Sequence, residues 1–196
     1  MCASPQPLAA PGSMSDMGSQ PAWPHDAEMH AWWVEPGRLL AGEYPGSKDP
    51  EQAQLKIELL VDAGVDSIID LTTPHDPLLP YDDRLHSAAV QAGRNVRRFS
   101  YPIPDMGVID DAGYDAILAR IRDEMKAGRV VYVHCWGGKG RTTTVIGCLL
   151  VDTGRDYAAT IAHIAELRAG TRKAHSPCPE TRAQHDVIRR RSERDL

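Results

Sequence analysis

The segment VVYVHCWGGKGRTTTVIGCLLV, residues 130–151, carries the clearest structural signal in this sequence. Residues 130–133 form a short β-branched run that predicts a central strand, and residues 142–152 form an apolar run that predicts a buried helix. The glycine-rich turn between them, residues 134–141, leads directly into the helix N-terminus. These three parts together predict an anion-binding site, because backbone N–H groups point inward and the helix dipole favours negative charge.

The rest of the sequence alternates predicted strands with predicted helices. Apolar and β-branched runs predict further strands at residues 37–45, 65–71 and 95–101. Apolar stripes at helical spacing predict helices at residues 50–63, at residues 82–92, from Asp110 or Asp111 up to Gly128, and at about residues 156–169 and 179–193. The alternation predicts an α/β fold, with a single domain and a mainly parallel central sheet flanked by helices.

The first 28 residues differ in composition from the rest of the chain. They are rich in Pro, Ser, Gly and Ala and have little periodic apolar pattern. Such a segment buries too little surface to offset the entropy lost on ordering, so residues 1–28 are predicted to be a disordered leader. Residues 29–196 are predicted to be the folded domain. Trp32 and Trp33 are expected to cover the edge of that domain.

Composition and charge exclude several classes of function. The formal net charge of −5 argues against general nucleic-acid binding, which favours basic surfaces. No segment is apolar enough to span a bilayer and the N-terminus lacks the features of a secretory signal, so a cytoplasmic location is expected. The cysteines at positions 2, 135, 148 and 178 and the scattered histidines lack ligand spacing, so no metal, cofactor or disulfide framework is expected. A monomer is the default expectation.

The turn at residues 134–141 contains the groups that phosphate binding requires. Glycine lets the backbone curl without steric cost, and Arg141 offers a planar guanidinium suited to bidentate contact with phosphate. The predicted phosphate-binding residues are Trp136, Gly137, Gly138, Lys139, Gly140 and Arg141.

A cysteine at the mouth of this turn indicates catalysis. Backbone N–H dipoles and Arg141 are expected to stabilise the thiolate form of Cys135, which makes it a nucleophile aimed at the bound phosphorus. Thr142 is expected to donate its hydroxyl to the sulfur and ease departure of the thiolate during hydrolysis. A passive anion site remains the alternative, although such a site needs no cysteine.

His134-Cys135-x5-Arg141-Thr142 resembles the signature of the protein tyrosine and dual-specificity phosphatase superfamily, and the HCxxGxGRT form of the loop resembles its compact dual-specificity members. The resemblance covers most of residues 32–190. It implies the cysteine-phosphatase fold and hydrolysis through a phosphocysteine intermediate. It also implies that His134 hydrogen-bonds the loop to hold its shape and does not act as a base.

Transfer of a phosphoryl group to sulfur leaves an oxyanion that needs a proton. Asp105 lies thirty residues before Cys135 in the segment YPIPDMG, residues 101–107, and this order resembles the general-acid loop of compact dual-specificity phosphatases. Asp105 is therefore the predicted general acid, and it would act as base toward water in the second step. The weaker candidates for this role are Asp70, Asp76, Asp82 and Asp83.

Residues 176–184, SPCPETRAQ, resemble the family element that opens the last helix. By that match Gln184 would orient the hydrolytic water. A glutamine on the surface of the helix is the alternative interpretation.

The substrate follows less directly from the residues. The absence of a recognisable phosphotyrosine-recognition loop and the short chain favour a compact, open site that acts on phosphotyrosine, with some activity on phosphoserine or phosphothreonine. The expected partner is a phosphorylated protein or a small phosphoester. Lys139 matches a lysine of the phosphoinositide phosphatases related to tensin, which makes a phosphoinositide or an inositol polyphosphate the first alternative. A non-catalytic phosphate-binding module is the second.

Overall fold

The structure is a computed structural model, and it describes residues 22–194. The elements in chain order are β1 (Ala31–Glu35), β2 (Leu39–Gly42), α1 (Pro50–Asp62), β3 (Val65–Asp70), α2 (Asp82–Gln91), β4 (Arg97–Ser100), α3 (Asp111–Lys126), β5 (Val130–His134), α4 (Gly140–Val151), α5 (Tyr157–Arg168) and α6 (Arg182–Ser192). The predicted α/β fold is therefore confirmed.

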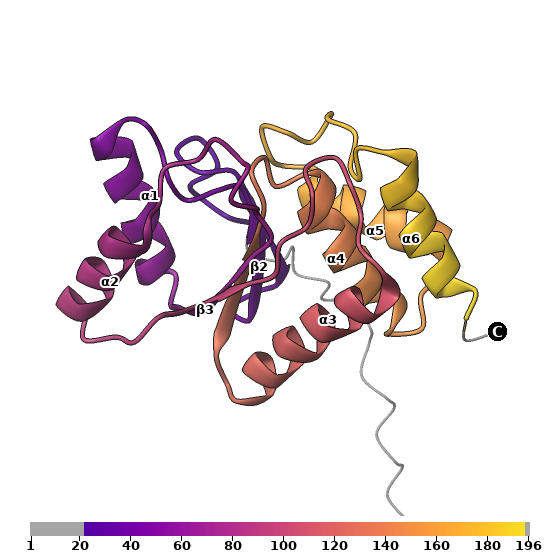
Figure 1. The fold of residues 1–196 in the computed structure, drawn as a ribbon. Helices are drawn as coiled ribbons and strands as arrows, with labels where there is room; N and C mark the ends of the chain where they lie inside the picture. Colours follow the sequence, from indigo (N-terminus) through magenta and orange to yellow (C-terminus); the bar gives the residue numbers. More distant parts are fainter. Residues whose placement is uncertain (1–21, 195–196) are drawn as a thin grey trace, which may run out of the picture.

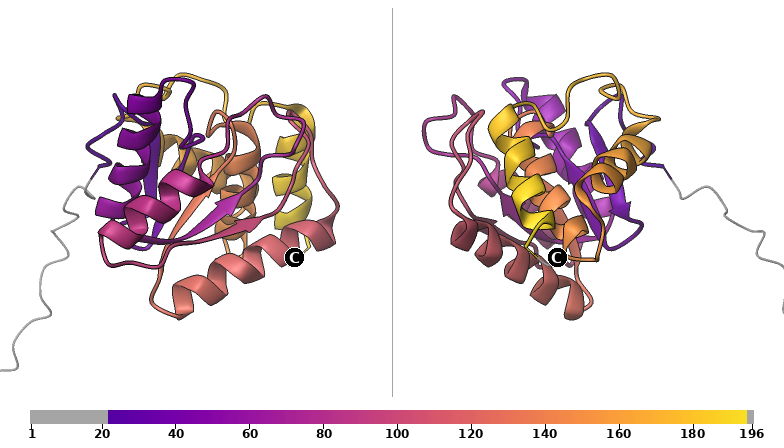
Figure 2. Two further views of the ribbon diagram at one scale, coloured as in Figure 1. Left: turned by 60° about the vertical axis from the view of Figure 1, so that its left-hand side comes forward. Right: turned by 90° about the vertical axis from the view of Figure 1, so that its right-hand side faces the viewer.

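The five strands form one sheet in the order β1-β2-β5-β3-β4. Strand β1 pairs with β2 in the antiparallel sense, and all other neighbours are parallel. Helices α1 and α2 cover one face of the sheet, and α3, α4, α5 and α6 cover the other (Figures 1 and 2). The strand that begins at Val130 is central, as the sequence predicts.

Because both faces of the sheet are covered, the central strands contribute to two apolar cores. In β5, Val131 and Val133 belong to the core under α3 to α6, while Tyr132 belongs to the core under α1 and α2. In β3, Ile69 and Ile68 divide in the same way. This alternation follows from the two-residue period of a strand, and it explains why apolar residues occupy consecutive positions at Ile68–Ile69 and Val131–Val133.

The register of the parallel strands aligns their carboxyl ends in one row. Gly42 of β2 and Asp70 of β3 are both paired with His134 of β5, and Ser100 of β4 is paired with Asp70. The loops that follow these residues therefore leave the sheet at the same edge. In open α/β sheets, ligand sites form at this edge.

The N-terminal part of the domain differs from the sequence prediction. Trp32 and Trp33 lie inside β1, and Trp32 is buried. Residues 22–28, which fall within the predicted leader, form turns in which Trp23 is also buried and donates from Nε1 to the carbonyl of Met29 at 2.9 Å. The packed part of the chain therefore begins before residue 29, and residues 1–21 of the predicted leader lie outside the described residues. Strand β1 was missed because its pairing with β2 is not visible in the local pattern.

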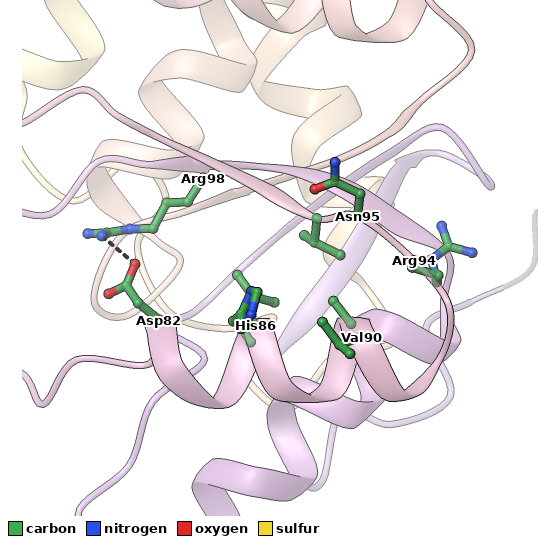
Figure 3. Close-up of a pocket in the computed structure, with 9 residues that line it drawn as sticks. Asp82, His86, Val90, Arg94, Asn95 and Arg98 are labelled. Atoms are coloured by element: carbon green, nitrogen blue, oxygen red, sulfur yellow. Dashed lines mark hydrogen bonds and ion pairs between the residues drawn. The ribbon is translucent and has the colours of Figure 1, made fainter.

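A cavity of about 330 Å³ lies between α2 and β4 (Figure 3). An ion pair at 2.9 Å between Arg98 and Asp82 closes one end of it. Neither Cys135 nor Arg141 lines this cavity, so it is separate from the loop that the sequence identifies. None of the helices within residues 22–194 is long and apolar enough to span a membrane.

Candidate active site

Cys135 follows the last residue of β5 and is 3% exposed. Helix α4 begins five residues later at Gly140, and all of its residues are buried. Lys139, at its N-cap, makes no side-chain capping hydrogen bond within the described part of the chain. The first N–H groups of a helix lack partners inside the helix, so this N-terminus can receive an anion.

At two of the three loop glycines, a residue with a side chain would clash with its neighbours. Gly138 has a φ of +71°, and a Cβ there would lie 2.6 Å from the carbonyl carbon of Gly42. A Cβ at Gly140 would lie 2.9 Å from the side-chain amide of Gln184. At Gly137 a Cβ would meet only Lys139, at 3.4 Å. The loop is therefore packed closely against the end of β2 and the start of α6.

His134 connects the loop to the domain core. Its Nδ1 lies 3.2 Å from the carbonyl oxygen of Cys135, so Nδ1 carries the proton and donates it. The hydroxyl of Tyr81 lies 2.8 Å from Nε2 and donates to it. Burial lowers the pKa of His134 below its ordinary value, although Asp70 nearby opposes this shift. The neutral ring therefore holds the loop in place.

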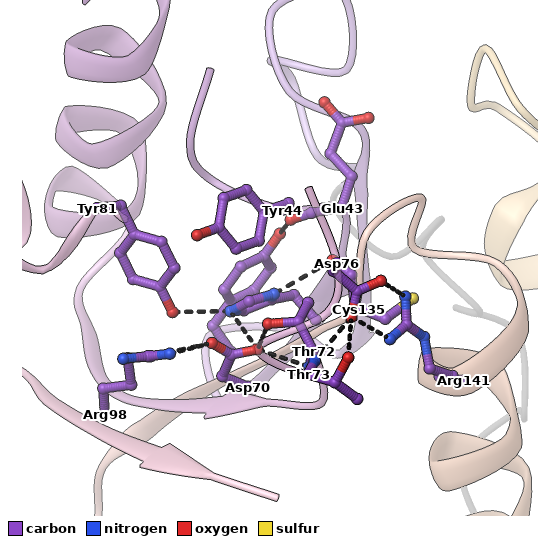
Figure 4. Close-up of polar contacts among 12 residues, drawn as sticks. Glu43, Tyr44, Asp70, Thr72, Thr73, Asp76, Tyr81, Arg98, Cys135 and Arg141 are labelled. Atoms are coloured by element: carbon purple, nitrogen blue, oxygen red, sulfur yellow. Dashed lines mark hydrogen bonds and ion pairs between the residues drawn. The ribbon is translucent and has the colours of Figure 1, made fainter. Parts of the chain in front are cut away.

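Arg141 is fully buried and contacts two carboxylates, of which Figure 4 shows Asp76. Its Nη1 and Nη2 donate to the two carboxylate oxygens of Asp76, at 3.0 and 3.1 Å. Nη1 also donates to the carbonyl of Ile103, at 3.1 Å. Asp76 accepts two further hydrogen bonds from the amide and hydroxyl of Thr73. These contacts fix the plane of the guanidinium beside the loop.

Asp105 is the second carboxylate at Arg141. Its Oδ1 lies 2.9 Å from Nη2 of Arg141, and its side chain is half-exposed. Asp105 therefore contacts the guanidinium from the loop after β4, while Asp76 contacts it from the loop after β3. The general acid predicted from the sequence and the predicted phosphate-binding arginine lie in direct contact.

The remaining acid candidates point elsewhere. Asp70 is fully buried and accepts from Arg98 Nε and Nη2, at 2.9 and 2.6 Å. Asp82 pairs with the same arginine at the start of α2, and Asp83 follows in the first turn of that helix. These contacts serve the packing of α2 and β4.

Asp76 is different from these three, because both of its oxygens contact Arg141. Burial alone would raise the pKa of Asp76, but the hydrogen bonds from Arg141 and Thr73 outweigh burial and hold the pKa below the ordinary value. Asp76 is therefore ionised near neutral pH and carries no proton to give. Its geometry makes it a partner that orients Arg141, a role that the sequence alone does not indicate.

Replacing Asp76 with asparagine tests this orienting role. We expect kcat/KM to fall by about 10- to 100-fold, the equivalent of one charge-assisted contact of about 1.5–3 kcal/mol. The loss should be the same for good and poor leaving groups, because Arg141 acts on the phosphoryl group and not on the leaving oxygen. Steady-state kinetics with aryl and alkyl phosphates would measure it, and the thermal midpoint would report folding. An unchanged or higher rate would contradict the role.

Thr142 and Gln184, both predicted to be catalytic, are fully buried. Thr142 Oγ1 has no hydrogen-bond partner within residues 22–194, so its proton is not claimed by a neighbour. Gln184 Oε1 accepts from the amides of Glu180 and Thr181, and its Nε2 donates to the carbonyl of Gly107 at 3.4 Å. The alternative of a surface glutamine is wrong, because this side chain joins the N-terminus of α6 to the loop of Asp105.

Lys139 Nζ lies 2.7 Å from Glu180 Oε1, so a carboxylate offsets the charge of this loop lysine. Behind the loop, the thiol of Cys178 lies 3.2 Å from the carbonyl of Lys139 and 2.6 Å from the hydroxyl of Thr143. Burial raises the pKa of Cys178 to about 11, which keeps it a thiol near neutral pH. Cys178 therefore supports the loop as a packed neutral group.

A cluster of cations that the sequence does not predict lies beside Gly137. Glu43 pairs with Lys56 at 2.8 Å, with Arg172 at 2.9 Å and with Lys173 at 2.7 Å. Lys173 Nζ also donates to the carbonyl of Gly137 at 2.9 Å. These residues come from three separate parts of the chain, so no local pattern could have indicated them. We call Glu43, Lys56, Arg172 and Lys173 the Glu43 cluster.

No group of three or more His, Cys, Asp and Glu side chains able to hold a metal ion occurs among the described residues. The polar groups around Cys135 include Arg141, the two carboxylates that contact it and the N–H groups of the loop. This set can bind a phosphoryl group, attack it with sulfur and exchange a proton with the departing oxygen.

Comparisons with known proteins agree with this chemistry. The family model described as PTP-SAK, Swiss Army Knife protein, DSP-PTPase phosphatase domain, matches residues 29–192. Among curated proteins, the phosphatidylglycerophosphate phosphatase PTPMT2 of Arabidopsis thaliana is 28% identical over 141 residues. The match covers 70% of this chain but 55% of that protein, so the chain spans about half the length of this relative.

Solved structures show the same fold. Kinase-associated phosphatase, with its catalytic-site cysteine changed to serine, superposes with a TM-score of 0.67 at 22% identity, over 86% of this chain and 98% of that one. Tk-PTP in its active form superposes with a TM-score of 0.63 at 23% identity, over 84% of this chain and 97% of that one. With the family match across most of the domain, the chain belongs to the PTP-SAK family of dual-specificity-type phosphatase domains and is a cysteine-based phosphatase.

Proposed function

We propose that this chain hydrolyses phosphomonoesters in two steps through a phosphocysteine intermediate. The observation that carries the proposal is the contact between Asp105 and Arg141 at 2.9 Å. Arg141 ends the same segment, residues 134–141, in which Cys135 lies. In the first step the Cys135 thiolate attacks phosphorus, the S–P bond forms and the bond to the leaving oxygen breaks. Asp105 gives its proton to that oxygen.

In the second step Asp105 takes a proton from water, and the water oxygen attacks phosphorus. The P–S bond then breaks, which releases inorganic phosphate and the Cys135 thiolate. The unclaimed hydroxyl of Thr142 supports a role for this residue in stabilising the departing sulfur. Gln184 is retained as the residue that orients the water, because its buried amide lies against Gly140 and next to the loop of Asp105.

Asp105 is a better general acid than Asp76 for a physical reason. Asp76 is locked by two hydrogen bonds to Arg141 that favour its charged form. Asp105 is half-exposed and makes a single contact with Arg141. When a phosphate dianion binds Arg141, competition for Nη2 would free the Asp105 carboxyl, which then carries the proton to the leaving oxygen.

For the substrate, our first candidate is the phosphorylated headgroup of a lipid. Lys139 no longer supports this class, since Glu180 offsets its charge. The Glu43 cluster does, because three cations surround one carboxylate beside Gly137. Asp26 accepts from the backbone of Arg172, and counting it still leaves one positive charge in excess. The name of the curated relative, a phosphatidylglycerophosphate phosphatase, supports the same class.

The second candidate is phosphotyrosine in a protein, with some activity on phosphoserine or phosphothreonine, as the sequence favours. One observation supports it. Trp136, directly after the nucleophile, is 45% exposed. An exposed indole at this place can pack against the ring of a phosphotyrosine. The non-catalytic alternative is disfavoured, because nucleophile, arginine and acid all meet at one site.

A panel of substrates tests the proposal. Release of phosphate would be measured from p-nitrophenyl phosphate, a phosphotyrosine peptide, a phosphothreonine peptide, an inositol polyphosphate and phosphatidylglycerophosphate in vesicles. We expect turnover of p-nitrophenyl phosphate and the highest kcat/KM on the lipid. A higher kcat/KM on the phosphotyrosine peptide would replace the first candidate with the second. Absence of turnover on every substrate would refute the enzymatic proposal.

A further inference from the structure

Large apolar side chains are concentrated around the active site. Five are strongly exposed in the part of the chain that the structure describes. Three of them lie on the loops that surround Cys135, namely Leu79 at 53%, Met106 at 50% and Trp136 at 45%. The other two, Leu55 and Val90, lie on α1 and α2. We call Leu79, Met106 and Trp136 the apolar rim.

Hydrogen bonds join two of the rim loops through Tyr44. The Tyr44 hydroxyl donates to the carbonyl of Leu79 at 2.9 Å, and its backbone amide donates to the carbonyl of Trp136 at the same distance. The third rim residue, Met106, directly follows Asp105, which contacts Arg141. The three apolar side chains therefore lie on the loops that carry Asp76, Asp105 and Cys135.

The backbone conformation of Met106 also indicates that its exposed side chain serves a contact outside the chain. Its φ is +57°, a left-handed backbone that is unfavourable for a residue with a Cβ. In the isolated chain this methionine is half-exposed, so burial in the protein core offsets little of that cost. A methionine held outward in this way is suited to packing against something outside the chain.

The positively charged side chains beside the apolar rim indicate which kind of partner it binds. Arg172 and Lys173 of the Glu43 cluster are partly exposed, at 42% and 23%, and Lys173 contacts the carbonyl of Gly137 in the loop itself. Apolar side chains together with neighbouring cations are the combination that binds an anionic lipid surface. A neutral apolar partner would leave the one excess positive charge of the Glu43 cluster without a complementary charge.

We propose that the apolar rim, with Arg172 and Lys173, docks on the surface of a membrane that contains anionic phospholipid. The inference rests on the lipid candidate for the proposed function. Docked in this way, the loop of Cys135 faces the headgroup layer, and a headgroup phosphate enters it without the lipid leaving the bilayer. The rim then acts as an interfacial anchor for the reaction.

Vesicle binding tests the docking surface. The full chain with Cys135→Ser, which prevents turnover during the assay, would be sedimented with vesicles of phosphatidylcholine alone or mixed with phosphatidylglycerol. We expect binding to the mixed vesicles and weak binding to phosphatidylcholine alone. Adding Leu79→Gln and Met106→Asn should weaken binding at least about tenfold, since each side chain loses an apolar contact. Asparagine tolerates the left-handed backbone at residue 106.

The matched control carries Leu55→Gln and Val90→Gln, which remove two exposed apolar side chains, at 39% and 61%, from helices α1 and α2 and leave the apolar rim intact. This control should bind the mixed vesicles as the parent does. Equal losses in both variants, no loss in the rim variant, or equal binding to both kinds of vesicle would overturn the proposal. Leu79→Gln in the active enzyme should leave turnover of p-nitrophenyl phosphate unchanged, which shows that the site remains folded.

The same experiments separate failure of the docking surface from failure of the proposed function. Vesicle binding without turnover of any substrate would refute the enzymatic proposal and leave the docking surface in place. Turnover of the phosphotyrosine peptide without vesicle binding would overturn the docking surface and assign the apolar rim to a protein substrate. The phosphocysteine chemistry would stand in that case.

Discussion

Replacing Cys135 with serine is expected to abolish turnover, with a loss of at least about 10⁴-fold in kcat. Sulfur is a far stronger nucleophile toward phosphorus than a serine hydroxyl, which keeps its proton and attacks poorly. The loop N–H groups and Arg141 remain in the variant, so phosphate binding should persist. Steady-state hydrolysis of p-nitrophenyl phosphate would measure the loss, and calorimetric titration with phosphate would measure the binding.

The wild-type enzyme should in addition form a trapped intermediate. After acid quenching during turnover, mass spectrometry should find one phosphoryl group on the peptide that contains Cys135. Cys178→Ser is the matched control, because this thiol lies behind the same loop and burial keeps it protonated. It should retain most of the activity. Residual turnover in Cys135→Ser within tenfold of wild type would remove Cys135 from its role.

Replacing Asp105 with asparagine should produce a loss that depends on the leaving group. An alkyl phosphate leaves as a strongly basic oxyanion, so the absence of a proton donor should slow its hydrolysis by about 10²–10⁴-fold. p-Nitrophenolate leaves without a proton, and its release should slow much less. The ratio of kcat/KM values for the two substrates, compared between wild type and variant, gives the effect directly.

The contact between Asp105 and Arg141 adds a second expected result for this variant. Asparagine has no negative charge to compete with phosphate for Arg141 Nη2. The variant should therefore bind inorganic phosphate at least as tightly as wild type. Equal slowing for both leaving groups would transfer the acid role to another residue. Asp76→Asn provides the contrast, since its expected loss is the same for both.

Most of the fold could be predicted from local patterns. Asp49 and Pro50 predict the start of α1, and in the structure Asp49 caps that helix by accepting from the amides of Glu51 and Gln52. Asp110 caps α3 in the same manner, through the amide of Gly113. Signals of this kind lie within one turn of the helix they start, so the sequence displays them directly.

Strand β1 and residues 22–28 could not be predicted in this way. Residues 31–35 become a strand because β2 offers an unpaired edge, and Trp23 is buried because that strand brings an apolar surface to it. Both the strand and the burial of Trp23 depend on contacts with residues outside the short segment of sequence in which each lies. Tertiary pairing commonly overrides weak local preference in such segments.

The candidate site likewise has one part that the sequence predicts and another that only the tertiary contacts identify. Cys135, Arg141 and Thr142 are neighbours in one turn, and their roles follow from chemistry that the contiguous sequence displays. Asp76 was one of four weak acid candidates, and only its contact with Arg141 distinguishes it from the other three. Lys139 pairs with Glu180, and Gln184 contacts Gly107 in the loop of Asp105; both contacts join segments that are distant in the chain.

The sequence by itself therefore determined the nucleophile, the phosphate-binding loop and the α/β class, because each depends on residues adjacent in the chain or on a repeated local pattern. Only the tertiary structure decided which carboxylate orients Arg141, where the excess positive charge lies and which apolar side chains surround the site. Those properties arise because the parallel strands end in one row, at Gly42, Asp70, Ser100 and His134, and so bring loops from distant parts of the chain to one edge of the sheet.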